Sequence, residues 1–192
     1  MKRINSFVEM CVEKDYVSQE RAAWLQYALE KRIVTVMGFI PLLVLGFMIA
    51  RPATVVGFIA AFCLLRSRTN GYHAKSIGRC LVYSIVGEVI FLKVLPVVWD
   101  NIICCTVLIV AVLLIWFFAP YNYPNMDLSQ EEIVACAKSA KCRLIMCFFA
   151  LGISYGWGQY QFARGIFLGI VMTATTLVMA YCIKWRKLDE GI

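Results

Sequence analysis

The chain has 192 residues, of which 61% are hydrophobic and only 16% are charged, and its formal net charge is +7. Soluble domains carry roughly 25% charged residues, so this composition excludes an ordinary soluble protein and predicts an all-α membrane protein. The cations do not alternate with aromatic residues along a polar face, so nucleic acid is not an expected partner.

Residues 1–32 are predicted to form a cytosolic amphipathic region. From Ser18 to Ile33, charged residues alternate with apolar ones near helical spacing, which is typical of a helix lying at a membrane surface. Ser18 is the expected N-cap, with Glu20 in the first turn. The N-terminal segment is charged throughout, so no cleavable signal peptide is expected.

Six apolar segments follow, and a helix needs about 20 apolar residues to span a bilayer. Two segments meet that length, namely 101–119 and 163–183. Three come close, namely 33–50, 77–99 and 144–160, while 52–65 is either a short span or a re-entrant piece. We therefore predict about six transmembrane helices within residues 33–183 of a single membrane domain that covers 1–192.

The distribution of cations predicts the orientation of these spans. With a cytosolic N-terminus, 16 of the 19 Lys and Arg residues face the cytosol, and they lie in 1–32, 66–79, 120–143 and 184–192. Such an excess is typical of the cytosolic loops of membrane proteins. Both termini and the loop 66–80 are therefore expected in the cytosol, with 184–192 as a short tail.

The nine cysteines do not indicate disulfides or a metal site. Most of them lie inside apolar segments, where cysteine behaves as a small hydrophobic residue. No CxxC pair is present, and a single histidine excludes the His-rich zinc patterns. No metal or other cofactor is expected.

The loop 66–80 holds the residues that carry chemistry. It contains the only histidine, His73, and it ends at Cys80, beside a cationic run at a predicted membrane boundary. A cysteine nucleophile needs a nearby base and a positive environment that favours the thiolate. Taken singly, His73 is more typical of a solvated loop residue and Cys80 of simple packing, so the inference rests on their combination.

Helical geometry restricts how the two groups can meet. In one unbroken helix His73 and Cys80 would lie about 10 Å apart along the axis, too far for a hydrogen bond. The chain must therefore bend between them. Ser76 is a plausible N-cap, which starts the next helix at Ile77 and places Cys80 in its first turn. There the helix dipole and Arg79 would favour the thiolate.

Three residues of the following span fall on one helical face. Cys80, Ser84 and Glu88 are spaced four residues apart, and an ionisable residue in a membrane normally faces the protein interior or a wet cavity. This face is expected to point inward. Glu88 either pairs with Lys93 or another helix, or contacts a substrate.

The loop and the span after it resemble the accessory gene regulator B (AgrB) family of bacterial membrane endopeptidases in peptide quorum sensing. The resemblance rests on the run Arg68-x-x-Gly71-x-His73-Ala74, on Cys80 seven residues after the histidine, and on Ser84. An Ala-Pro pair at 119–120 is consistent with it. It implies a multi-pass protein of the bacterial cytoplasmic membrane that acts as a homodimer among membrane lipids.

The same resemblance implies roles for particular residues. Cys80 would be the nucleophile and His73 its base. Glu30 would be a third site residue, because Tyr27-Ala-Leu-Glu30 matches a family pattern except for Ala28 in place of glycine. Ser84, Arg68 and Gly71 belong to the matching motif and are implied as supporting or substrate-binding groups. Arg79 is added to them because its charge lies next to Cys80.

The implied substrate is a small AgrD-like precursor peptide with an amphipathic leader and an acidic C-terminal tail. The enzyme would remove the tail through an acyl-thioester and promote cyclisation to a thiolactone or lactone. Two other functions remain open on the residues alone. One is a small transporter with Glu88 and Lys93 along its path, and the other is a non-catalytic membrane scaffold whose basic loop binds a cytosolic partner.

Overall fold

A computed structural model of the chain describes residues 2–14, 16, 18, 22, 25–26, 38–70, 77–94, 101–122 and 129–189. The chain separates into two units, Met1–Val44 and Leu45–Ile192. Every regular element in the described ranges is a helix, so the all-α prediction is confirmed there.

The first unit contains helix α1, Lys2–Glu13, and the start of an apolar helix, Gly38–Ile49. Helix α1 is amphipathic in sequence, because charged residues such as Glu9 alternate with apolar ones such as Val8, which is buried. It lies within the predicted region 1–32 but was not itself predicted. The expected helix from Ser18 to Ile33 falls mostly outside the described residues, as does Glu30.

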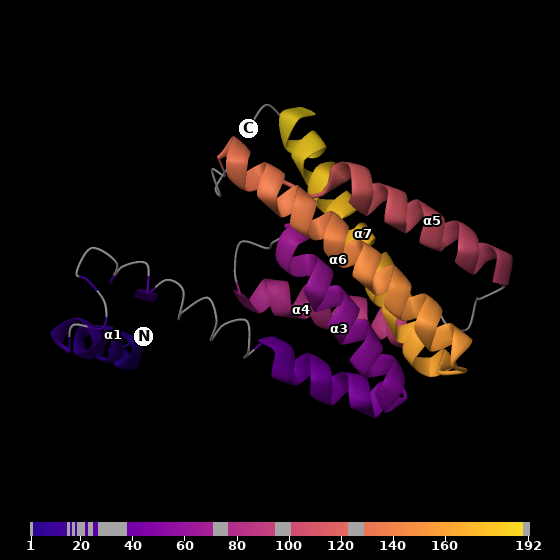
Figure 1. The fold of residues 1–192 in the computed structure, drawn as a ribbon, viewed down its shortest axis with the longest axis horizontal. Coiled ribbons are helices and arrows are strands. Elements are labelled where there is room, and N and C mark those ends of the chain that lie inside the picture. Colours follow the sequence, from indigo (N-terminus) through magenta and orange to yellow (C-terminus); the bar gives the residue numbers. More distant parts are fainter. Residues whose placement is uncertain are drawn as a thin grey trace. The chain divides into compact units, whose positions relative to one another are not determined.

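The second unit is built around α7, which is the longest described helix at Tyr160–Asp189 (Figure 1). Helices α3, α5 and α6 all pack against it, and α6 also contacts α3 and α5. These three helices are α3 Pro52–Thr69, α5 Asn101–Phe118 and α6 Gln130–Gly156. Between α3 and α5 the chain forms α4, Ile77–Val89, which continues as the π-helix η1, Ile90–Val94.

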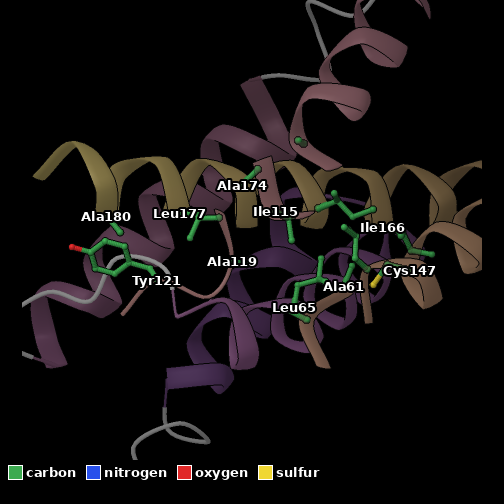
Figure 2. Close-up of a cluster of buried hydrophobic side chains, with 14 residues drawn as sticks. Ala61, Leu65, Ile115, Ala119, Tyr121, Cys147, Ile166, Ala174, Leu177 and Ala180 are labelled. Atoms are coloured by element: carbon green, nitrogen blue, oxygen red, sulfur yellow. The ribbon is translucent and has the colours of Figure 1, made fainter. Parts of the chain in front are cut away.

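The core lies where α3, α5, α6 and α7 meet. Leu65, Ile115, Leu144 and Leu177, one from each helix, are almost completely buried. Figure 2 shows Leu65, Ala61 and Cys147 toward one end of the cluster and Tyr121 and Ala180 toward the other. Since apolar side chains from four helices share this cluster, it fixes the helices of the second unit to one another.

Helices α3 and α7 approach each other closely at three glycines. A Cβ atom added to Gly165 would lie 2.1 Å from the carbonyl oxygen of Thr54, and one added to Gly169 would lie 2.7 Å from that of Phe58. From α3, a Cβ on Gly57 would lie 2.5 Å from the carbonyl oxygen of Phe162. Small residues four apart allow this kind of backbone contact between membrane helices.

One described helix is long and apolar enough to cross a membrane, the 24-residue stretch Tyr160–Ile183 with a mean hydropathy of 2.1. Gly38–Ile49 and Ile103–Phe118 are shorter apolar helices. Large apolar side chains are exposed on several helices, for example Met48, Phe117 and Phe149. Such surfaces favour contact with lipid. Six spans stay a prediction.

Two helices extend beyond the apolar segments that predicted them. Helix α6 begins at Gln130, fourteen residues before the predicted span at 144–160, because a capping box starts it. The Ser129 hydroxyl accepts from the Glu132 amide at 3.3 Å, and the Ser129 amide donates to the Glu132 carboxylate at 3.0 Å. Helix α7 continues to Asp189, so most of the predicted tail 184–192 is helical.

Candidate functional site

The loop that carries the candidate residues begins at the end of α3. Asn70 has φ 50° and ψ 38°, a left-handed conformation that ends the helix after Thr69. Arg66 and Arg68 lie in the last turn, where cations interact favourably with the negative end of the helix dipole. Local sequence therefore specifies a helix end immediately before Gly71.

The connection between α5 and α6 holds this helix end from one side. The backbone amide of Tyr121 donates to the carbonyl oxygen of Thr69 at 3.0 Å, and Thr69 is fully buried. The Tyr121 ring packs edge-to-face on Tyr181 of α7, with 4.9 Å between ring centroids. Tyr181 in turn donates its hydroxyl to the carbonyl oxygen of Phe118 at 3.0 Å. The Ala-Pro segment is thus part of the support for the end of α3.

Helix α6 holds the same end through polar contacts. Nη1 of Arg143 donates to the carbonyl oxygen of Leu64 at 2.9 Å and also to the hydroxyl of Ser67. The Ser67 hydroxyl donates to the same Leu64 carbonyl at 3.0 Å. Nη1 of Arg68, a predicted site residue, lies 4.0 Å from the sulfur of Cys136 and is exposed to solvent. Sequence reasoning missed Arg143 and Ser67, because no local pattern shows that they meet.

Helix α4 begins at Ile77, as predicted, so Arg79 and Cys80 belong to its first turn. Helix α3 ends at Thr69 and α4 starts at Ile77 as a separate helix. The predicted bend between His73 and Cys80 involves residues outside the described ranges and stays a prediction. Gly71 and His73 lie outside the described residues, so the distance from imidazole to sulfur stays a prediction.

The inward face of α4 was predicted correctly at Glu88, which is fully buried. Its carboxylate lies in a notch made by Gly46, because a Cβ on that glycine would be 2.8 Å from Oε1 of Glu88 and 2.7 Å from Val55. Ser84 on the same face is half-buried.

The possible pairing of Glu88 with Lys93 is wrong. Both carboxylate oxygens of Glu88 lack a hydrogen-bond partner among the described residues, while Lys93 is exposed. The physical reason is the spacing, since residues that share a helical face are three or four apart and Lys93 follows Glu88 by five. The two residues therefore do not line a common path, which removes the main support for a transporter.

Comparison with known protein families was decisive for classification. The family model described as accessory gene regulator B matches residues 4–177. The chain belongs to the AgrB family. This is a membrane-associated family of the accessory gene regulator system that takes part in peptide processing. No curated protein and no solved structure gave a match.

Family membership agrees with the resemblance found in the loop. The matched range includes most of α1, the region of Glu30, the loop 66–80 and the helices α3 to α6. It also includes most of α7, whose glycines form the tight contact with α3. The family match therefore covers the whole second unit up to residue 177.

Proposed function

We propose that the chain is a membrane-embedded cysteine endopeptidase that removes the C-terminal tail of an AgrD-like precursor peptide and promotes its cyclisation. The observation that carries this proposal is the helix break between α3 and α4. It places Cys80 in the first turn of a new helix, directly after the short segment that holds the only histidine of the chain. Membership of the AgrB family supports the same assignment.

In the first step, His73 accepts the thiol proton and the Cys80 thiolate attacks the carbonyl carbon at the tail junction. Backbone amides at the start of α4 are available to stabilise the oxyanion, because the first amides of a helix have no partner within it. The peptide C–N bond then breaks, and His73 returns the proton to the leaving amine. The remaining peptide is held as a thioester on Cys80.

In the second step, a thiol or hydroxyl of the same peptide attacks the carbonyl carbon of the Cys80 thioester while His73 accepts its proton. A new thioester or ester closes the ring, and the Cys80 sulfur leaves as thiolate. Exchange of one thioester for another is nearly balanced in energy, which suits a cysteine nucleophile. Exclusion of water from the site favours cyclisation over hydrolysis.

The cations around the loop are proposed to attract the acidic tail of the precursor. Arg68 is exposed at the end of α3, and Arg66, Lys75 and Arg79 are close to it in sequence. This attraction should weaken at high salt, because exposed charges are screened over a Debye length of about 8 Å at physiological ionic strength. Glu30 is proposed as a further site residue, and a homodimer as the working form.

The reactivity of the cysteines tests the catalytic assignment. The purified full-length chain would be treated briefly with N-ethylmaleimide at pH 7, and labelling of all nine cysteines measured by mass spectrometry. We expect Cys80 to be labelled fastest, since a paired thiolate reacts faster than a buried thiol, and we expect His73→Ala to slow it. Equal labelling of Cys80 and exposed Cys142 in the wild type would contradict the proposal.

Cleavage gives the second test. The chain would be co-expressed with the peptide encoded by a neighbouring small reading frame that has an amphipathic leader and an acidic tail. Cys80→Ala and His73→Ala should each insert normally and abolish cleavage, because they remove the nucleophile and its base. Cys142→Ala, which changes an exposed cysteine of α6, serves as the matched control and should cleave normally. Wild-type cleavage by either site variant would refute the assignment.

A further inference from the structure

We propose that Arg143 is a positioning residue for His73, acting through the last turn of α3; this inference rests on the proposed function. Arg143 belongs to α6, 79 residues away from Leu64 in sequence, yet it bonds the helix end from which the loop departs. It does not reach the reacting atoms by any contact that is described. Its role is to fix where the loop begins.

The contact is well suited to that role. A single guanidinium nitrogen serves two acceptors, the Leu64 carbonyl oxygen and the Ser67 hydroxyl, and the hydroxyl bonds the same carbonyl. Hydrogen bonds from a charged donor are stronger and more directional than neutral ones. The positive charge also lies at the negative end of the α3 dipole. Together these bonds tie α6 to α3 within six residues of Asn70.

A second, independent contact prevents the helix end from swinging about Arg143. The Tyr121 amide bonds the carbonyl of Thr69, and Thr69 is fully buried. The end of α3 is thus held by α6 at Leu64 and Ser67 and by the α5–α6 connection at Thr69. His73 follows Asn70 by three residues, which span at most about 11 Å. The helix end from which the loop departs therefore has two fixed points.

The Arg143 contact lies apart from the packing that stabilises the fold. The backbone contact between α3 and α7 occurs at Gly57, Gly165 and Gly169, and the apolar core buries Leu65 and Leu144. Arg143 is only half-buried, and Ser67 is exposed. Removal of the guanidinium should therefore shift the loop while leaving the helices assembled.

The experiment measures the pH dependence of Cys80 labelling by N-ethylmaleimide in the full-length chain. A thiol that has lost its base reacts only at higher pH, so His73→Ala should move the labelling curve upward in pH. We expect Arg143→Met to move it in the same direction, with labelling at pH 7 falling by about threefold or more, the change that half a pH unit produces. Arg143→Lys should recover part of the loss, because lysine keeps the charge and one donor but not the planar fork.

Lys141→Met is the matched control. Lys141 lies on the same helix, but its Nζ is 5.1 Å from the ring centroid of Trp116. This variant should keep the wild-type curve. The midpoint of unfolding by dodecyl sulfate, measured in parallel, separates loss of stability from loss of position. If Arg143→Met does not fold, Ser67→Ala removes half of the same contact and should shift the curve in the same direction.

The outcomes separate this inference from the proposed function. If His73→Ala shifts the labelling curve and Arg143→Met does not, the inference is overturned and the peptidase assignment stands. A lower unfolding midpoint for Arg143→Met with an unchanged curve overturns it equally, since it shows a structural role only. If His73→Ala itself leaves the curve unchanged, the catalytic pair and the inference both fall.

Discussion

Substitution of Gly165 by alanine is the sharpest test of how α3 and α7 pack. The added methyl group would lie 2.1 Å from the Thr54 carbonyl oxygen and 2.8 Å from the Phe58 amide nitrogen. Both neighbours are backbone atoms of a helix, so they cannot rotate away as the end of a side chain could. The two helices would have to separate locally by roughly 1.4 Å to reach ordinary van der Waals contact near 3.5 Å.

The expected magnitude follows from two opposing effects. Overpacking of a well-packed interior costs about 1–3 kcal/mol, and a backbone clash belongs at the upper end. Alanine is favoured over glycine inside a helix by about 1 kcal/mol, which offsets part of that cost. We therefore expect a net loss of about 2 kcal/mol in the free energy of unfolding, a factor of about 30 in the folding equilibrium.

Gly152→Ala provides the matched control, because no atom lies within 4 Å of the position that its Cβ would occupy on α6. This variant should gain up to about 1 kcal/mol from helix propensity alone. Both variants would be unfolded reversibly by dodecyl sulfate in mixed micelles and followed by circular dichroism. A midpoint for Gly165→Ala equal to or above that of Gly152→Ala would refute the described contact between α3 and α7.

Two further predictions concern α4 and α6. Glu88→Met should raise the unfolding midpoint, because an apolar side chain of similar length replaces a fully buried carboxyl that lacks a hydrogen-bond partner among the described residues. An unsatisfied buried polar group costs about 1–3 kcal/mol. A lower midpoint would show that Glu88 has a stabilising partner. Ser129→Ala should lower the stability of α6 by about 1 kcal/mol, since it removes the capping box with Glu132. Ser129→Asp keeps a side-chain acceptor and should restore most of that loss. Amide exchange at residues 130–133 would report fraying of the helix start, and unchanged protection there would contradict the prediction.

The amino-acid sequence by itself determined the all-helical class of the described fold and the start of α4. Apolar segments of sufficient length predicted α5 and most of α7, because burial of apolar surface and internal hydrogen bonding in lipid both require helices. The start of α4 at Ile77, with Cys80 in the first turn, also followed from local signals. These features depend on neighbouring residues, whose chemistry is readable in order along the chain.

Only the tertiary structure decided which helices meet and through which atoms. Arg143 and Leu64 are 79 residues apart, and the approach of Gly165 to Thr54 depends on how two helices cross. The early start of α6 at Gln130 depended on a cap that apolar content does not register. The burial of Glu88 without a hydrogen-bond partner among the described residues depended on the close approach of Gly46. Contacts between distant segments are set by packing of whole helix surfaces, and a local pattern contains no information about the partner surface.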